Sequence, residues 1–421
     1  MSTNLVWHRT TLPNGLTVLL YPRQSANTAQ LSITVKSGSN QEPVKAAGIT
    51  HFLEHMLAGG STQRIQLSRS IEDSGGVLDF YTDHEQVTST LDVLPQKLPQ
   101  GLSVLCSLLF DGGFDLEKFE VERKIILNEL AEFADDPSVR VEELLLEHLF
   151  KKHPVKRPVG GYPKTVKGLT LEQVQLEHQT NYTPKNMILT LAGNYTEETK
   201  TQILNDLSQK DCAAKPKKAR NLRETAKPKS LVETKKVGIT QTYLYVGART
   251  VNSKHPDSAA IDLIATLLGG GTTSRLFELL REKHAVTYDV AAAQCKGTDY
   301  GYLGITCAVK NKKAQRAIDL ITKEIKKLQT VPVPEGELER AKQVMLGGVL
   351  RGMDNPHDTL EILNYMEMQY GSATALKDYV KRITSATSRD VTQAANQYLN
   401  ADSLCTALLT PARNGQKHKS K

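Results

Sequence analysis

The sequence predicts an α+β fold of two homologous domains from a duplicated unit, each with an antiparallel-rich sheet packed against long helices. Segments typical of strands are grouped apart from long runs typical of helices, which favours α+β over a regularly alternating parallel sheet. The same order of segments also returns after about 200 residues. With 421 residues, of which 39% are hydrophobic and 24% charged, the chain can bury a core in each domain.

The first half of the chain begins with strand-like segments and ends with helix-like ones. Residues 16–21 and 31–35 are rich in apolar residues, and the second segment alternates apolar with polar positions. The expected elements are strands at 16–21, 31–35, 77–81 and 87–91, a helix between Gly48 and Gly59, and amphipathic helices from about Leu98 to Phe150.

The second half repeats this order. Three glycines at 269–271 lack the lysine of a phosphate-binding loop and follow a helix-like segment, so we interpret them as a tight turn. The expected elements are strands at 239–246, 287–292 and 301–309, a helix at 258–268, another after the glycines, and long helices from Lys312 to about Tyr398.

A basic stretch separates the two halves. Residues 212–231 carry many lysines and arginines, two prolines and few large apolar side chains, a composition typical of a connector. We therefore expect a first domain at 1–211, a linker at 212–231 and a second domain at 232–421.

Charge and composition exclude several classes of protein. The net charge of +7 is concentrated in the connector and the last residues, and aromatic residues make up only 5%. Nucleic-acid binding needs basic residues interleaved with aromatic ones on a folded face, so we expect no nucleic-acid partner. No run of about 18 apolar residues occurs, so we expect no membrane-spanning helix.

The first residues and the cysteines favour a cytoplasmic location. The opening MSTNLVWHRT has neither the features of a secretory signal nor those of an organellar presequence. The five cysteines are an odd number without a Cys-x-x-Cys pair, so we interpret them as reduced thiols.

The pentapeptide at residues 51–55, His-Phe-Leu-Glu-His, is the clearest chemical signal in the sequence. On a helix, His51 and His55 lie on one face about one turn apart, so both imidazoles can bind one metal ion. Glu54 can then act as a general base on the attacking water without being a ligand. The sequence is the inverted form of the His-Glu-x-x-His zinc motif. The alternative is a solvated helix face with one half-buried histidine.

A catalytic zinc site needs a third protein ligand that is distant in sequence. Two candidates, Glu122 and Glu129, lie seven residues apart and share one face of a predicted helix. For Glu122, a surface glutamate without function is the alternative.

The pentapeptide, followed 74 positions later by Glu129, resembles the pitrilysin or insulinase family of zinc peptidases, the inverzincins. The members of about 50 kDa, which are related to mitochondrial processing peptidase, are the most similar. The resemblance implies that His51, His55 and Glu129 bind zinc, that Glu54 is the catalytic base and that Glu122 supports a ligand. It covers nearly the whole chain, through landmarks at residues 12–16, 55–60, 153–161, 182–187, 192–193 and 269–283.

In the second half, the resemblance implies that Arg281 and Tyr288 bind substrate. Both side chains donate hydrogen bonds, so they can hold a substrate carbonyl and stabilise the oxyanion that forms on it. The alternative is an arginine paired with Glu278 or Glu282 on a helix surface, and a tyrosine in the core of the sheet.

The resemblance also implies an assembly and an activity. In family members of this size, two chains close around a chamber, and the zinc site of one chain meets the arginine and tyrosine of the other. One chain here carries both sets, which favours a homodimer over a heterodimer with a related subunit. The expected function is zinc-dependent endopeptidase activity on peptides or unfolded segments. The alternatives are a catalytically silent structural or partner-binding subunit of the family, and a metallohydrolase with another substrate.

One position departs from the family pattern. Asp79-Phe80 stands where the family usually has Asn-Ala, on the strand that pairs with the substrate backbone. Edge pairing uses main-chain groups, so peptide binding is expected to survive. Asp79 could favour a basic residue in the substrate, and an exposed carboxylate without a role is the alternative.

Overall fold

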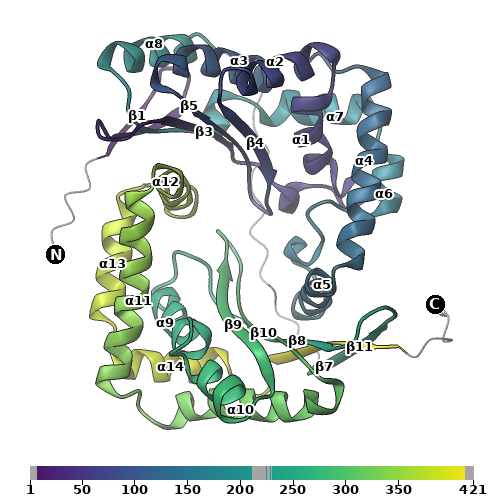
Figure 1. Ribbon diagram of the computed structural model, residues 1–421, viewed down its shortest axis with the longest axis vertical. Helices are drawn as coiled ribbons and strands as arrows, with labels where there is room; N and C mark the ends of the chain where they lie inside the picture. The colour runs from purple at the N-terminus through teal and green to yellow at the C-terminus, as the bar shows by residue number, and fades with distance from the viewer. Residues whose placement is uncertain (1–6, 211–223, 225–227, 229, 413–421) are drawn as a thin grey trace. The chain divides into compact units, whose positions relative to one another are not determined.

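Two mixed sheets form the framework of this computed structural model, which describes residues 7–210, 224, 228 and 230–412. The first sheet has six strands in the order β1-β2-β6-β3-β5-β4, so β1 and β4 are its edges (Figure 1). The strands are β1 (His8–Thr11), β2 (Thr17–Pro22), β3 (Ala29–Val35), β4 (Val77–Thr82), β5 (Val87–Val93) and β6 (Met187–Gly193).

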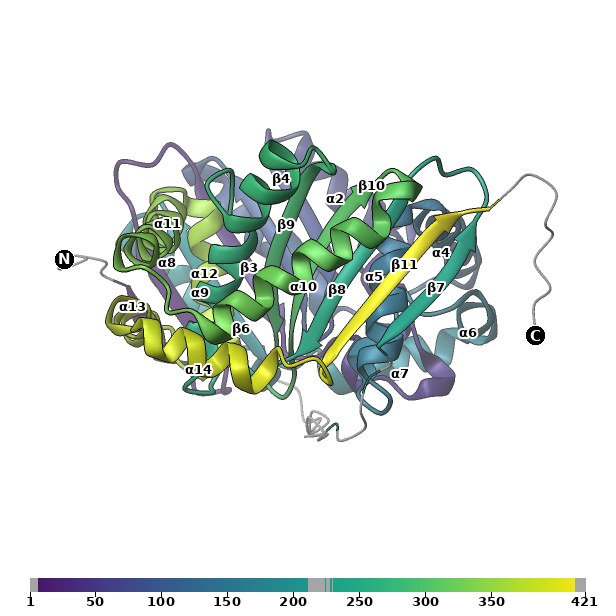
Figure 2. The ribbon, with the colours of Figure 1, turned by 90° about the horizontal axis from the view of Figure 1, so that it is seen from below.

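The second sheet has five strands in the order β7-β11-β8-β10-β9 (Figure 2). The strands are β7 (Leu231–Lys236), β8 (Thr242–Arg249), β9 (Thr287–Lys296), β10 (Gly301–Val309) and β11 (Leu404–Pro411). In both sheets one pair of neighbours is parallel, β2 with β6 and β7 with β11, and the other pairs are antiparallel.

The two sheets confirm the expected duplication. If β2, β3, β4, β5 and β6 are matched with β7, β8, β9, β10 and β11, the strand order is the same, and the single parallel pair falls at the same place. Strand β1 is an addition at one edge of the first sheet. The predicted α+β class with two antiparallel-rich sheets is therefore confirmed.

The helices follow the same order in the two halves. The first half contains α1 (Ile49–Gly59), α2 (Thr62–Glu72), α3 (Leu98–Phe110), α4 (Leu116–Asp135), α5 (Pro137–Leu149), α6 (Pro163–Gly168), α7 (Leu171–Asn181) and α8 (Glu197–Ser208). The second half contains α9 (Ser258–Gly269), the π-helical segment η6 (Phe277–Lys283), α10 (Ala314–Thr330), α11 (Glu335–Asp354), α12 (Pro356–Tyr370), α13 (Ala375–Ser385) and α14 (Ser388–Tyr398).

Each compact unit includes one helix from the other half of the sequence. The first unit contains the described residues of Met1–Ala131, Arg157–Arg220 and Leu350–Leu376. The second contains those of Glu132–Lys156, Asn221–Val349 and Lys377–Lys421. Helix α12 therefore packs on β6 and β3 of the first sheet, while α5 packs on β11 and β8 of the second. Most of the expected linker at 212–231 lies outside the described residues.

Helix α12 explains why β3 is buried on both faces. The alternation along 31–35 predicted one buried and one polar face, yet every residue of β3 is buried. The Asn364 side chain on α12 donates to Ser32 Oγ at 2.7 Å and accepts from Thr190 Oγ1 of β6. The other polar side chains of β3 bond to its neighbour β5, Gln30 to Asp92 at 2.7 Å and Thr34 to Thr88 at 3.1 Å. The polar positions of the strand are thus buried because α12 and β5 satisfy their hydrogen bonds.

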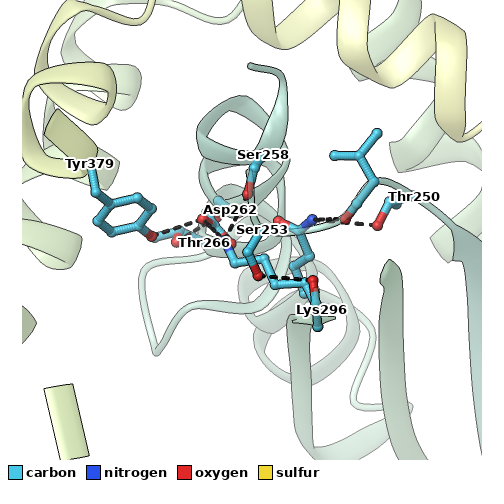
Figure 3. A network of polar contacts seen from close by, with 10 residues as sticks. Thr250, Ser253, Ser258, Asp262, Thr266, Lys296 and Tyr379 are labelled. Atoms are coloured by element: carbon cyan, nitrogen blue, oxygen red, sulfur yellow. Dashed lines mark hydrogen bonds and ion pairs between the residues drawn. The ribbon is translucent and has the colours of Figure 1, made fainter. Parts of the chain in front are cut away.

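A buried lysine joins three elements of the second unit (Figure 3). Lys296 on β9 donates to Ser258 Oγ at 2.9 Å and forms an ion pair with Asp262, both on α9. The Tyr379 hydroxyl of α13 donates to the same Asp262 carboxylate at 2.8 Å. Burial lowers the pKa of Lys296, and the Asp262 carboxylate opposes this effect. The network holds α9, β9 and α13 together and leaves its charged groups paired.

The remaining structural expectations concern membranes and cysteines. In the ranges that the structure describes, no helix combines the length and the apolar character needed to cross a bilayer. The described cysteines (Cys106, Cys295, Cys307 and Cys405) are all unbonded thiols, and Cys212 lies outside the described residues.

Candidate metal centre

Helix α1 carries the His51–His55 pentapeptide, and a buried carboxylate fixes where the helix begins. The residue before the helix, Gly48, has φ +93° and no side chain to cap the first turn. Glu42 takes over this role, because its carboxylate accepts hydrogen bonds from the backbone N–H groups of Gly48 and Thr50, both at 2.8 Å. A side chain at Gly48 would also collide with the Gly160 carbonyl.

Arg157 holds the backbone around Glu42 in place. Arg157 donates from Nη2 to the backbone carbonyls of Ser39 and Glu42 at 3.0 and 3.2 Å. Burial raises the pKa of Glu42 to about 7, although the hydrogen bonds from Gly48 and Thr50 and the charge of Arg157 oppose this rise. The start of α1 therefore depends on a carboxyl group that is kept away from solvent.

A buried arginine fixes the other end of α1. Arg64, 3% exposed, donates from Nη1 to the Leu57 carbonyl in the last turn of α1 at 2.8 Å and to the Leu108 carbonyl of α3 at 2.6 Å. It also donates to the Asp111 carbonyl. A guanidinium in this position donates to carbonyls that have no helical partner. Its positive charge also stabilises the negative, C-terminal end of the helix dipole.

The two histidines point toward the same place, as their spacing predicted. The rings of His51 and His55 have centroids 4.8 Å apart and meet edge to face. Phe52, the residue after His51, packs into the core of the first unit and stacks on Phe119 of α4 at 4.6 Å. This contact holds α1 against α4, on which Glu122 and Glu129 lie.

Helix α4 brings Glu129 to the two imidazoles. Glu129 Oε2 lies 3.6 Å from His51 Nε2 and 3.3 Å from His55 Nε2. This oxygen is buried and accepts no hydrogen bond of good geometry from any described residue. Two imidazole nitrogens and one carboxylate oxygen that converge without being satisfied match the three-ligand donor set of a catalytic zinc site. Within the described chain, this is the one group of three such side chains.

Glu122 supports the site from two turns earlier on the same face of α4. Its Oε2 lies 3.1 Å from His55 Nδ1, on the opposite side of the ring from Nε2. The approach is close because α1 has a glycine at position 59, where a Cβ atom would lie 2.2 Å from Glu122 Oε1. A carboxylate at Nδ1 fixes the ring orientation and leaves Nε2 to face a metal ion.

The charges of the site follow from this arrangement. Burial lowers the pKa of His51, and the neighbouring His55 adds to this effect. Burial alone would also lower the pKa of His55, but contacts with Glu122 and Glu129 outweigh burial and raise it to about 9. The contact with His55 lowers the pKa of Glu129. Since a ligand must be deprotonated, metal binding is expected to compete with a proton on His55.

Glu54 lies beside the three ligand candidates without belonging to them. Its Oε2 accepts a hydrogen bond of 2.7 Å from Thr82 Oγ1 on β4. Burial raises the pKa of Glu54 to about 7, and the Thr82 hydrogen bond partly opposes this rise. A carboxylate whose pKa is close to neutral can accept a proton and return it, as a general base requires.

Arg281 and Tyr288 lie together in the second unit. The guanidinium carbon of Arg281 is 4.5 Å from the centroid of the Tyr288 ring and 4.7 Å from that of Phe277, distances typical of cation–π contacts. Tyr288 is 80% exposed, which contradicts the alternative of a tyrosine in the sheet core. Among the described residues, Arg281 forms no ion pair with Glu278 or Glu282, so the surface-pair alternative is also wrong.

The second unit does not repeat the metal centre. Helices α1 and α9 both end in a glycine that a second glycine follows, so the two can be matched from this end. The match places Ile261, Ile264 and Ala265 where α1 has His51, Glu54 and His55. Helices α4 and α11 have 20 residues each, and Gly348 takes the place of Glu129. Apolar residues thus replace the polar groups after duplication.

The sequence contained weak signals for the residues that support the site. Glu42 stands six residues before a glycine at a helix start, and Thr82 directly follows a predicted strand, but neither pattern identifies a contact. Arg64 resembled any arginine of an amphipathic helix. The supporting roles of these three residues follow only from their contacts in the three-dimensional structure.

Comparison with known proteins decides the family. Residues 17–162 match the family model described as insulinase (peptidase family M16), and residues 168–345 match the one described as peptidase M16 inactive domain. The two matches cover most of the chain. The chain belongs to peptidase family M16.

Several M16 relatives match this chain over nearly its whole length. An uncharacterised zinc protease of Mycobacterium leprae is 28% identical over 399 residues, which cover 93% of this chain and 89% of the relative. A probable mitochondrial-processing peptidase subunit beta of Arabidopsis thaliana is 27% identical over 423 residues, covering 96% and 78%. The crystal structure of a protease from Helicobacter pylori has the same fold, with a TM-score of 0.88 at 19% identity and coverage of 96% and 99%.

Replacement of Glu42 tests the buried carboxyl group at the start of α1. Its folded-state pKa of about 7 lies above the ordinary value of 4.5, so folding takes up a proton between these pH values. Glu42 therefore makes the free energy of unfolding fall as the pH rises from 4.5 to about 7, by roughly 3 kcal/mol. Urea unfolding at several pH values should show that Glu42→Gln lacks this fall. Wild-type and variant curves that stay parallel across this range would contradict a buried, protonatable Glu42.

Proposed function

We propose that this M16 chain is a zinc-dependent endopeptidase that hydrolyses peptides or unfolded segments. The observation that carries the proposal is the convergence of His51 Nε2, His55 Nε2 and Glu129 Oε2, with Glu54 beside them. The names of the relatives, which are zinc proteases and a processing peptidase subunit, support a metalloprotease in general.

The residues of the site have separate roles in metal binding and proton transfer. His51, His55 and Glu129 would hold the zinc ion, and Glu122 would keep the His55 ring in its orientation. When bound, zinc supplies the Lewis acidity that polarises a scissile carbonyl and lowers the pKa of water to about 7. Glu54 takes the proton from the attacking water and delivers it to the leaving amine.

An exposed sheet edge next to the site suits an extended peptide. Strand β4 pairs with β5 on one side, and in the described part of the chain no strand pairs with its other side. A peptide can add there through main-chain hydrogen bonds. Asp79 of β4 is exposed, and its Oδ1 accepts from the Phe80 N–H at 2.9 Å.

Replacement of Glu54 separates metal binding from catalysis. Glu54→Gln should retain one zinc per chain, because Glu54 is not among the ligand candidates, and should lose peptide hydrolysis by about 10²–10⁴-fold. The measurements are hydrolysis of a mixed library of quenched peptides, with and without chelator, and zinc content by elemental analysis. Glu117→Gln, on the exposed first turn of α4, is the matched control and should cleave like the wild type.

A second function has one observation in its favour. The model that matches residues 168–345 is described as an inactive domain, and the second unit lacks the metal residues. A silent structural or partner-binding subunit would show bound zinc without hydrolysis in the same assay. The presence of all three ligand candidates and the base in the first unit favours the peptidase.

We further propose a homodimer in which Arg281 and Tyr288 of one chain serve the zinc site of the other. The 80% exposure of Tyr288 leaves its hydroxyl able to reach a second molecule. A mixture of a Glu54→Gln chain with an Arg281→Ala/Tyr288→Phe chain should regain about one quarter of wild-type activity, because half of the dimers would carry one complete site. No recovery in a mixture whose sedimentation shows mixed dimers would mean that both groups act within one chain.

A further inference from the structure

We propose that Thr82 is a positioning residue that couples the occupied edge of β4 to the base Glu54. The inference rests on the proposed peptidase function and goes beyond it. It states that binding of an extended substrate along β4 raises kcat as well as affinity. The link would be the hydrogen bond from Thr82 Oγ1 to Glu54 Oε2.

The contact between the two side chains is direct. The distance of 2.7 Å is that of a strong hydrogen bond to a carboxylate, and the pair is partly buried. Among the described residues, Thr82 is the one hydrogen-bond donor to the Glu54 carboxylate. Because a hydroxyl has a single proton to donate, this proton is committed to the base.

The strand geometry dictates where the Thr82 hydroxyl points. Side chains alternate along β4, so Leu78, Phe80 and Thr82 share one face. Leu78 and Phe80 pack against the core of the first unit, whereas Val77 and Asp79 are exposed on the other face. Thr82 is the last residue of this series. It lies where the core-facing side of β4 contacts α1, the helix that carries Glu54. Its β-branched side chain also has a restricted χ1 angle.

The hydrogen bond gives the two oxygens of Glu54 different tasks. Oε2 is tied to Thr82, so rotation of the carboxylate is restricted and Oε1 keeps one direction. An oxygen with a fixed direction can accept a proton from a water molecule without first being reoriented. Loss of the hydroxyl leaves the carboxylate in place but free to rotate, which affects the proton transfer rather than peptide binding.

Because β4 is an edge strand, the hydrogen bond between Thr82 and Glu54 links peptide binding at that edge to the catalytic base. Thr82 pairs with Val87 of β5, and the opposite side of its strand is the edge where a peptide would add. An added peptide strand restrains the backbone of β4, and this restraint passes through Thr82 to Glu54. Long extended peptides should therefore be turned over faster than short ones, in addition to being bound more tightly.

The test compares two quenched peptides with the same scissile core, one short and one extended at both ends by residues with high strand propensity. For the wild type, kcat should be higher on the long peptide. Thr82→Val, which removes the hydroxyl and retains the branched shape, should lower kcat on the long peptide about tenfold with KM within about twofold. It should thereby abolish the difference in kcat between the peptides. Thr82→Ser, which keeps the donor, should restore the wild-type kcat on the long peptide to within about threefold.

Zinc content and thermal unfolding of each variant show whether the metal site and the fold are intact. If Thr82→Val does not fold, Thr82→Ala is used in its place. Wild-type kcat in Thr82→Val, or an equal loss on both peptides, overturns the coupling while the peptidase function stands. Failure of Thr82→Ser to recover overturns the role of the hydroxyl. A wild type that binds zinc and cleaves neither peptide overturns the proposed function and this inference with it.

Discussion

The capping of helix α1 by buried charged side chains is the constraint on which the metal centre depends. Glu42 accepts from the first backbone N–H groups, and Arg64 donates to a carbonyl of the last turn. Between these two fixed ends, one helical turn sets the spacing of the histidines. Glu129 meets their Nε2 atoms because α4 packs closely against the same helix. If the first turn of α1 shifted, the three donors would no longer converge.

The candidate metal ligands lie in one half of a duplicated chain. The two sheets share strand order and parallel pair, so the second unit offers the same framework. In that unit, Ile261 and Ala265 occupy the places of the histidines, and burial of apolar side chains stabilises the helix without a metal. The second unit instead presents the exposed side chain of Tyr288.

The parts of this account that the sequence predicted are those with local patterns. The helix at 48–59, most of the strands and the shared face of Glu122 and Glu129 follow from periodicity and spacing. The choice of Glu129 over Glu122 as a ligand came from the resemblance to a family, because both lie on one helix face. In the structure, Glu129 faces the Nε2 atoms and Glu122 faces Nδ1 of His55.

The parts that the sequence did not predict depend on contacts between distant segments. An amphipathic pattern shows that α5 and α12 each have an apolar face, but it does not say which sheet that face covers. The polar residues of β3 suggested an exposed face, but α12 covers the strand, and Asn364 of that helix, some 330 residues later in the chain, bonds to Ser32. Glu42, Arg64 and Thr82 act through partners that no local pattern indicates.

The most direct test of the central claim is a crystal structure of the zinc-loaded protein with an anomalous difference map recorded at the zinc absorption edge. The account predicts one peak per chain, bonded to His51 Nε2, His55 Nε2 and a Glu129 oxygen at about 2.0–2.2 Å, with Glu54 outside bonding distance. A peak at other residues, or zinc bonded to Glu54 in place of Glu129, would contradict the assignment of ligands and base.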